Sequence, residues 1–476
     1  MITFREVINV LSSTRVNVGN YPLTEVVIDS RNVIPGSVFA ALKGERTDGH
    51  DYVSQAFRDG ARGAIISQDL PEFSTITIDT RSDELKNLKL INQADQSFCI
   101  RVPDTLKALQ DLAAYWRQKL PIRVIGITGS VGKSSTKELI SEVLSHQFST
   151  FKNPGNYNNE IGLPLTILNL GSGYQKLILE MGFYYPGEIS FLCQISKPNI
   201  GVITNVGTVH AERAGSQQTI ADGKAELVTA LPASPLGTAI LNHDDMLVRE
   251  MAEKTEAAVI FYGLNPQADI WADEIKGMGL NGIQFRLHYQ SDTIRLNAPI
   301  LGRHSVQTIL RAAAVAIVEG MELDQIAQAI ARSNSQLRLV AVRSGSGALI
   351  LDDTYNATPE STIAALELLS ELEGQKIAVL GDMLELGQYE AIGHQKVGIK
   401  AADIANHLIT VGEKGRLIAE SARQQGMSPI AITSVDNAAD AAELLRYNLT
   451  ENDVVLIKGS HGLRMDRIST ILEAAS

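Results

Sequence analysis

Short apolar runs that end at polar residues recur along the chain, and stretches with apolar residues at helical spacing separate them. The runs occupy residues 122–125, 177–179, 200–203, 348–351, 377–380, 408–411 and 454–457. Strands that are apolar along their whole length suit a parallel sheet that is covered on both faces. Because helices alternate with these strands, the pattern predicts an α/β fold with parallel sheets and helices on both faces.

The chain is too long for one ordinary hydrophobic core, since it has 476 residues. We predict three domains, residues 1–102, 103–334 and 335–476. The first alternates short apolar runs with turns and is expected to be a small α/β domain. The third repeats the alternation of apolar strands and helices described above.

The middle segment begins with an amphipathic helix that carries apolar residues from Leu106 to Trp116. Residues 270–301 are rich in strand-forming residues and contain an Asn281-Gly282 turn. Apolar residues at helical spacing then predict helices over Ile309–Ile317 and Leu323–Ala331.

One stretch, residues 125–136, has the order strand, glycine-rich turn, helix. Glycines at 126, 129 and 132 precede Lys133 and Ser134. Such a turn lets backbone N–H groups converge on phosphate oxygens, the helix N-terminus adds positive charge, and the lysine reaches the terminal phosphates. The common spacing would place glycine at 127, where this chain has Ile127. An incidental glycine turn is disfavoured because strand, glycines, lysine, hydroxyls and helix agree, so we expect a nucleoside triphosphate here.

Acidic residues end two of the apolar runs. Glu180 follows the run at 177–179, at the end of a strand where ligands of α/β sheets gather, and is a candidate Mg²⁺ ligand. The alternative, a carboxylate that caps the next helix, is less favoured. Asp352 and Asp353 end a later run and suit a contact that reaches across a domain cleft.

Other polar stretches leave two interpretations open. Asp29-Ser30-Arg31 could hold an anionic ligand, although a surface turn is favoured from residue chemistry alone. The asparagine-rich stretch 153–164 could contact a polar substrate or simply form turns, with equal weight. Taken alone, His210 is more often structural than a ligand. Lys224 is expected to open a helix and, taken alone, is more often a solvated helix lysine.

Composition narrows the classes of partner. Lys and Arg number 42 against 54 Asp and Glu, a formal net charge of −12, which argues against a general binder of nucleic acids or anionic membranes. Cys99 and Cys193 are the only cysteines, so no disulfide framework is expected. Neither a signal peptide nor a membrane-spanning stretch is evident, and a cytoplasmic protein is expected.

Taken together, these stretches resemble the Mur ligases over almost the whole chain. Asp29-Ser30-Arg31 with Thr47–His50 is similar to the uridine-nucleotide domain, and Thr128–Lys133 is similar to the family's phosphate loop. The stretches 155–164, 381–387 and 458–460 resemble signatures of the family member that adds D-alanyl-D-alanine. The resemblance implies an N-terminal domain that binds the UDP substrate, a central ATP-binding domain with a phosphate loop, and a Rossmann-like C-terminal domain.

The resemblance also implies roles for single residues. Lys133 would bind phosphate, Ser134 and Glu180 would hold one Mg²⁺, His210 would help to hold a second, and Lys224 would become a metal ligand by carbamoylation. The implied nucleotide contacts are Thr128, Gly129, Ser130, Val131, Gly132, Lys133, Ser134, Ser135, Thr308, Arg338 and Asp353. The implied substrate contacts are Ser30, Arg31, Asn156, Asn158 and Asn159, and the implied catalytic residues are Lys133, Glu180, His210 and Lys224.

The implied activity is ligation of D-alanyl-D-alanine to UDP-N-acetylmuramoyl-tripeptide through an acyl phosphate, with ATP and Mg²⁺, by a monomer in the cytoplasm. Two departures from the family pattern bear on adenine recognition: Ser305 and Thr308 stand where asparagines are expected, and Leu337 stands where glycine is usual. The alternatives are another Mur-type amino-acid ligase, a folate polyglutamylating enzyme, or a nucleotide-binding partner subunit that has lost ligation.

Overall fold

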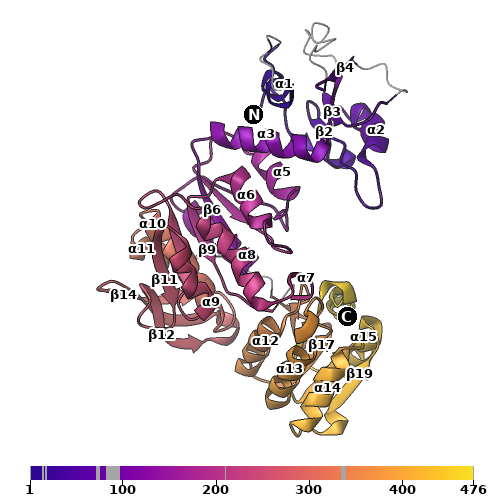
Figure 1. The fold of residues 1–476 in the computed structure, drawn as a ribbon. Coiled ribbons are helices and arrows are strands. Elements are labelled where there is room, and N and C mark those ends of the chain that lie inside the picture. Colours follow the sequence, from indigo (N-terminus) through magenta and orange to yellow (C-terminus); the bar gives the residue numbers. More distant parts are fainter. Residues whose placement is uncertain are drawn as a thin grey trace. The chain divides into compact units, whose positions relative to one another are not determined.

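A computed structural model describes residues 2–12, 16, 19–70, 76–81, 97–208, 211–333 and 339–474 of the chain. The fold contains two compact units, one made of residues 1–126, 148–182 and 188–199, the other of residues 127–147, 183–187 and 200–476. Three sheets account for the named strands of these units (Figure 1).

The N-terminal sheet has five strands in the order β1-β2-β3-β5-β4, and every pairing in it is parallel. Its strands and helices are β1 (Val26–Val27), β2 (Val38–Ala40), β3 (Gly63–Ile66), β4 (Ile76–Asp79), β5 (Phe98–Arg101), α1 (Phe4–Ser12) and α2 (Val53–Arg58). The four residues of β3 are all buried, as expected for an inner parallel strand. The expected small α/β architecture is therefore present.

The middle sheet has nine strands in the order β14-β13-β12-β11-β10-β9-β6-β8-β7. The strands are β6 (Arg123–Thr128), β7 (Thr150–Lys152), β8 (Lys176–Glu180), β9 (Ile200–Ile203), β10 (Thr238–Asn242), β11 (Ala258–Gly263), β12 (Ile270–Gly277), β13 (Ile283–Tyr289) and β14 (Asp292–Ala298). The helices are α3 (Thr105–Lys119), α4 (Lys133–Ser145), α5 (Gly162–Leu168), α6 (Glu188–Ser196), α7 (Ala211–Ala214), α8 (Gln217–Thr229), α9 (Met246–Arg249), α10 (Ser305–Val318) and α11 (Leu323–Ala331).

Burial separates the two kinds of strand in this sheet. All five residues of β8 are buried, which suits a strand covered on both faces. In β13 buried positions alternate with partly exposed ones, and its pairings with β12 and β14 are antiparallel. The β-rich stretch expected over residues 270–301 is therefore an antiparallel extension with one solvated face.

The C-terminal sheet has six strands in the order β15-β16-β20-β17-β18-β19. The strands are β15 (Val340–Arg343), β16 (Leu349–Asp353), β17 (Gln375–Gly381), β18 (His407–Val411), β19 (Ile432–Val435) and β20 (Asp453–Lys458). The helices are α12 (Pro359–Glu371), α13 (Glu390–Ile404), α14 (Gly415–Gln424), α15 (Ala438–Arg446) and α16 (Asp466–Ala474). Only the β15–β16 pairing is antiparallel among the pairings described for this sheet.

Successive residues of the C-terminal strands enter two different hydrophobic clusters. Leu351, Leu380 and Leu456 pack with α12, α13 and α14, whereas their chain neighbours Ile350 and Val455 pack with α15 and α16. Because side chains alternate between the faces of a strand, the two clusters lie on opposite faces of the sheet (Figure 1). The expected parallel sheet with helices on both faces is confirmed for this segment.

Two expected elements have different bounds in the structure. Helix α10 begins at Ser305, four residues before the predicted start at Ile309. The prediction missed this first turn because three of its four residues, Ser305, Gln307 and Thr308, are polar, although Ser305 and Thr308 are buried. The helix that contains Lys224 begins at Gln217, capped by the Ser216 side chain, so Lys224 lies inside it rather than at its start. The domain boundaries at 102 and 334 stay a prediction.

Candidate active site

The glycine-rich turn connects β6 to α4 as predicted. Thr128 ends the strand, Lys133 begins the helix, and Gly132 immediately before it has a φ of 84°, a left-handed conformation that glycine adopts without strain. Gly129 has a φ of 146°, and a Cβ there would lie 1.8 Å from Thr204 Oγ1. The turn can therefore take this shape only with glycine at position 129.

The residues that follow β9 hold the turn in place. The Ser130 and Val131 N–H groups donate to Asn205, to its backbone oxygen at 2.9 Å and its Oδ1 at 2.9 Å. Thr204 Oγ1 donates to the Val131 carbonyl at 2.7 Å, and the Gly207 N–H donates to Ser130 Oγ at 2.8 Å. Asn205 follows the apolar run at 200–203, but the sequence alone does not show that it shapes the loop.

The Lys133 side chain folds over the turn that precedes it. Its Nζ donates to the carbonyl of Gly129 at 2.8 Å and to that of Ser130 at 3.3 Å. Ser134, in the first helical turn, is almost fully buried. A lysine held over a glycine turn at a helix N-terminus is the arrangement that binds the phosphates of a nucleotide.

Lys224 is buried inside α8, so the solvated-lysine alternative is wrong. Its Nζ lies 5.0 Å from the centroid of the Phe183 ring. Burial lowers the pKa of Lys224 well below its usual value, and the nearby charge of Lys133 lowers this pKa further. The side chain is thereby biased towards the neutral amine, which is the form that reacts with carbon dioxide to give a carbamate.

Glu180 lies at the end of β8 with its side chain almost fully buried, next to the asparagine-rich loop. Asn158 Nδ2 donates to Glu180 Oε1 at 2.8 Å. Asn153 is fully buried, and its side-chain amide makes two hydrogen bonds with the Glu180 backbone: Nδ2 donates to the carbonyl at 3.0 Å and Oδ1 accepts from the N–H at 2.9 Å. The structure thus brings Glu180, a predicted metal ligand, into contact with Asn158, a predicted substrate residue. Asn153 attaches the start of the same loop to Glu180.

The other two predicted asparagines differ in environment. Asn159 Oδ1 accepts from the N–H groups of Gly162 at 2.9 Å and Ile161 at 3.3 Å, so its side chain helps to start α5. Asn156 is exposed in the same loop. The turn-forming interpretation therefore holds for Asn159, and Asn158 contacts Glu180 instead.

In the N-terminal domain, Ser30 and Arg31 lie on a short 3₁₀ turn, η1 (Ser30–Asn32). The Arg31 guanidinium is largely exposed and pairs with the Asp29 carboxylate at 2.6 Å, while Ser30 is buried. The predicted surface turn is therefore present. Whether an anionic ligand displaces the Asp29–Arg31 pair stays a prediction.

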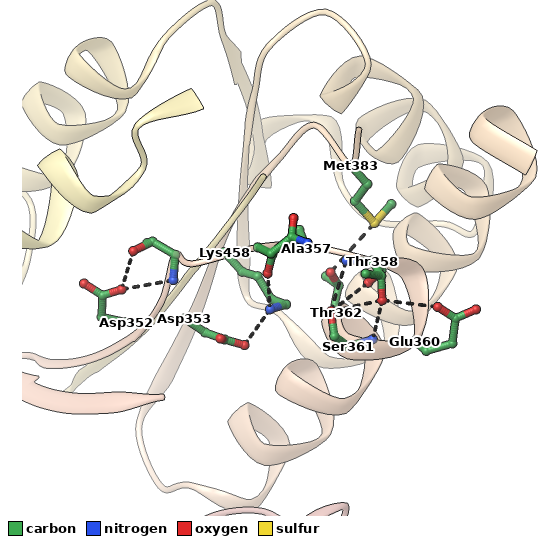
Figure 2. Close-up of polar contacts among 11 residues, drawn as sticks. Asp352, Asp353, Ala357, Thr358, Glu360, Ser361, Thr362, Met383 and Lys458 are labelled. Atoms are coloured by element: carbon green, nitrogen blue, oxygen red, sulfur yellow. Dashed lines mark hydrogen bonds and ion pairs between the residues drawn. The ribbon is translucent and has the colours of Figure 1, made fainter. Parts of the chain in front are cut away.

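Asp353, at the end of β16, pairs with a buried lysine that the sequence did not assign to it. Lys458 Nζ donates to Asp353 Oδ2 at 2.6 Å (Figure 2). It also donates to the Asn356 carbonyl at 2.9 Å. Beside them, Thr358 caps α12 and accepts from the Ser361 N–H at 3.2 Å. The pair connects the acidic end of the run at 348–351 with the 458–460 stretch, two features that are separate in the sequence.

Thr308 is buried in α10, where its hydroxyl accepts a hydrogen bond from Arg311 Nη2 at 2.8 Å. Sequence analysis did not single out Arg311, although a lone charged residue within the apolar stretch 309–317 is a detectable signal. The hydroxyl that replaces the expected asparagine thus interacts with another side chain of its own helix.

Three predicted positions, His210, Leu337 and Arg338, lie outside the described residues. Within the described residues, no group of three or more His, Cys, Asp or Glu side chains is arranged to hold a metal ion. Across the same part of the chain, no helix combines the length and apolarity needed to cross a membrane.

Comparison with known proteins gives three family-model matches in chain order. They are described as "Mur ligase family, catalytic domain" for residues 22–117, "Mur ligase middle domain" for residues 127–316, and "Mur ligase, glutamate ligase domain" for residues 337–461. A UDP-N-acetylmuramoyl-tripeptide–D-alanyl-D-alanine ligase of Bacillus subtilis is 33% identical over 93% of this chain and 92% of its own length.

Solved structures agree with this match. MurF from Acinetobacter baumannii superimposes with a TM-score of 0.84 at 27% identity, covering 99% of this chain and 98% of that one. MurF ligase from Thermotoga maritima, solved in complex with ADP, gives a TM-score of 0.78 at 27% identity, covering 95% of this chain and 97% of that one. The predicted three-domain α/β architecture is therefore confirmed.

Proposed function

The chain belongs to the Mur ligase family, and from this premise we propose that it joins D-alanyl-D-alanine to UDP-N-acetylmuramoyl-tripeptide while converting ATP to ADP and phosphate. The observation that carries the proposal is the turn between β6 and α4. There Lys133 covers a glycine loop and lies close enough to the buried Lys224 to lower its pKa. Full-length similarity to relatives of that name supports the choice of substrates.

In the proposed reaction, a terminal carboxylate oxygen of the tripeptide attacks the γ-phosphorus of ATP, which forms an acyl phosphate and releases ADP. The amine of D-alanyl-D-alanine then attacks the acyl carbon, loses a proton and forms the C–N bond as phosphate leaves. Catalysis of phosphoryl transfer rests mainly on positioning and charge neutralisation. A phosphate loop with a lysine supplies both.

We propose that the loop residues 128–135 bind the phosphates, with Thr308, Asp353 and Arg338 as further nucleotide contacts. Ser30 and Arg31 are proposed to contact the UDP part of the substrate. Asn156, Asn158 and Asn159 are proposed to contact its peptide part, and the contact between Asn158 and Glu180 supports a polar site at the end of β8.

The proposed magnesium ligands are Ser134, Glu180, His210 and the carbamate of Lys224. The first two fit such an ion because Mg²⁺ prefers hydroxyl and carboxylate oxygens and usually takes only one or two carboxylates from the protein. When bound, magnesium would neutralise charge on the transferred phosphoryl group. We propose that a monomer catalyses this reaction in the cytoplasm.

The test is phosphate release from ATP with UDP-N-acetylmuramoyl-tripeptide, measured with and without D-alanyl-D-alanine. We expect release that depends on the dipeptide. Lys133→Ala is expected to lower kcat/KM for ATP by roughly 10²- to 10³-fold, since one charged transition-state donor is removed. Lys107→Ala, which removes an exposed lysine of α3, is the matched control and should retain the parent rate.

The outcomes separate the candidate functions. Release that is indifferent to the dipeptide would favour a ligase for a different amino acid. ATP binding without release under any condition would favour a nucleotide-binding subunit that does not ligate. If Lys133→Ala turned over ATP at the parent rate, the phosphate loop would be wrongly assigned.

A further inference from the structure

Helix α10 contains one charged residue, Arg311, and its side chain is buried. Arg311 is 4% exposed, and its helix neighbours Leu310, Ala312 and Ala313 are buried as well. A buried charge is costly unless an opposite charge or enough hydrogen bonds compensate it. The groups that surround this guanidinium therefore indicate the role of Arg311.

Among the described residues, the hydrogen-bond partners of the Arg311 guanidinium are three neutral hydroxyls. Nε donates to Thr136 Oγ1 at 2.8 Å, Nη2 donates to Thr308 Oγ1 at 2.8 Å, and Nη1 donates to the Tyr262 hydroxyl at 3.3 Å. The guanidinium carbon lies 5.6 Å from the centroid of the Tyr262 ring. No carboxylate of the described residues forms an ion pair with Arg311, so within that part of the chain its charge is not neutralised.

The guanidinium lies directly against the phosphate loop. A Cβ built on Gly132 would be 3.1 Å from Arg311 Nη2. Thr136, which accepts from Arg311, in turn donates to the Gly132 carbonyl at 2.7 Å. The arginine is thus packed behind the last glycine of the loop and the first turn of α4.

This position is electrostatically unfavourable in the absence of an anion. The N-terminus of a helix carries partial positive charge, and a cation beside it is repelled. Lys133 adds a further positive charge at the start of the same helix. Three positive features therefore meet at one loop, and a polyanion bound there would interact favourably with all of them.

We infer that Arg311 is a positioning residue for the phosphate loop, whose buried charge raises the affinity for a polyphosphate and makes that affinity depend on the number of phosphates. The inference rests on the proposed nucleotide site. It also gives Thr308 a role, because its hydroxyl accepts a hydrogen bond from the guanidinium and helps to fix it behind the loop.

The experiment measures dissociation constants for ATP, ADP and AMP, together with the melting temperature of the full chain with and without each nucleotide. The variants are Arg311→Met, Arg311→Lys and, as a matched control, Arg117→Met. Arg117 is also buried, but its guanidinium donates to backbone carbonyls of Ser196, Leu120 and Ile122, away from the loop.

For Arg311→Met we expect ATP binding about tenfold weaker, ADP binding less affected and AMP binding changed by no more than about twofold, because the lost attraction scales with ligand charge. Without nucleotide, its melting temperature should equal or exceed that of the parent, since an uncompensated cation has been removed. Arg311→Lys keeps the charge and should keep the preference for ATP over AMP. Arg117→Met should melt lower without nucleotide and keep the parent's affinities.

A purely structural role for Arg311 predicts a different result. Equal weakening of ATP and AMP by Arg311→Met, with a lower melting temperature without nucleotide, would overturn the inference, as would parent-like affinities. If Arg311→Met does not fold, the Arg311→Lys variant decides. Loss of the preference for ATP over AMP in Arg311→Lys would also overturn the inference. Failure of the proposed function looks different: the parent would then bind no ATP, or Lys133→Ala would bind it equally well.

Discussion

At the scale of single residues, the shape of the phosphate loop depends on glycine at position 129, because a side chain does not fit there. Gly129 combines a φ of 146° with a Cβ position 1.8 Å from Thr204 Oγ1. Thr204 cannot turn away without cost, because its hydroxyl also donates to the Val131 carbonyl. Any side chain at 129 must therefore distort the loop or displace the residues that anchor it.

Gly129→Ala is accordingly expected to lower the free energy of unfolding by about 2–4 kcal/mol, from backbone strain and overpacking together. It should also abolish the rise in melting temperature that ATP produces. Gly173→Ala is the control, because a Cβ there meets nothing within 4 Å. A Gly129→Ala protein with the parent's response to ATP would mean that the loop geometry is not needed for binding.

The two members of the Asp353–Lys458 pair differ in burial, and this difference gives a second prediction. The Lys458 side chain is 2% exposed and that of Asp353 is 18% exposed. Asp353→Leu should lower the free energy of unfolding by about 3 kcal/mol, since it leaves a buried ammonium without its carboxylate. Lys458→Met should cost about 1 kcal/mol, because the remaining carboxylate reaches water.

Urea denaturation of the two single variants and the double variant measures these values. The double variant should be more stable than Asp353→Leu, because no unpaired buried charge remains in it. Equal losses in the two single variants, or simple additivity in the double, would contradict this account of the pair.

Residue-scale prediction from sequence worked where chemistry is local. Lys133 and the glycines before it are contiguous, so their loop was predictable from spacing, and Glu180 was placed correctly at a strand end. Arg311 and Asn153 act through tertiary partners: Arg311 contacts Thr136, 175 positions away. No periodicity along the chain encodes such a contact, which is why Arg311 was missed and Asn153 was given no role of its own.

At the scale of elements, the loop between β17 and α13 is held by a buried histidine. The Met383 N–H donates to His394 Nε2 at 3.0 Å, and His394 Nδ1 contacts the Glu390 carbonyl at 2.7 Å. One nitrogen must accept and the other donate, so the ring is neutral with its proton on Nδ1. Ser460 also anchors this loop, because its Oγ accepts a hydrogen bond from the Leu384 N–H at 2.9 Å.

This arrangement predicts a stability that depends on pH. Burial lowers the pKa of His394 and the charge of Lys414 lowers it further, which outweighs the opposing effects of Glu390 and Asp382. Below about pH 6.5 the unfolded chain binds a proton that the folded protein resists, so stability is lost as pH falls through that value towards the folded pKa. His394→Gln should remove this part of the pH dependence.

The measurement is the free energy of unfolding between pH 7.5 and pH 5.5, compared between the parent and His394→Gln. The parent should lose more stability across this window than the variant. His407→Gln, which changes an exposed histidine of β18, should keep the parent's slope. Identical slopes for the parent and His394→Gln would show that the ring accepts a proton without disturbing the loop.

Elements were predictable from sequence where apolar periodicity covers their whole length. The bounds of α11 match the predicted helix, Leu323–Ala331. The start of α10 was missed because Ser305 and Thr308 are buried by tertiary packing although their side chains are polar. A hydrophobic pattern cannot reveal a turn whose polar side chains are buried and hydrogen-bonded, Ser305 to the Leu301 carbonyl and Thr308 to Arg311 of the same helix.

At the scale of the whole molecule, the C-terminal segment contains everything that an independent domain needs. It has its own six-stranded sheet and a hydrophobic cluster on each face. The family-model match ends at residue 461, before α16 (Asp466–Ala474). The helix nevertheless places Ile468 and Leu472 in the cluster that contains Ile350 and Val455, so the physical domain extends beyond the matched region.

A fragment of residues 335–476 is therefore expected to unfold cooperatively in urea, whereas a fragment of residues 335–461 should not. Loss of Ile468 and Leu472 removes two buried side chains worth about 2–5 kcal/mol each, against a typical domain stability of about 5–15 kcal/mol. The Ser469 hydroxyl, which donates to Asp352, is lost with them. Circular dichroism during urea titration distinguishes the two fragments. A cooperative transition in the shorter one would mean that α16 only covers the sheet, and a gradual transition in both would place the domain boundary before residue 335.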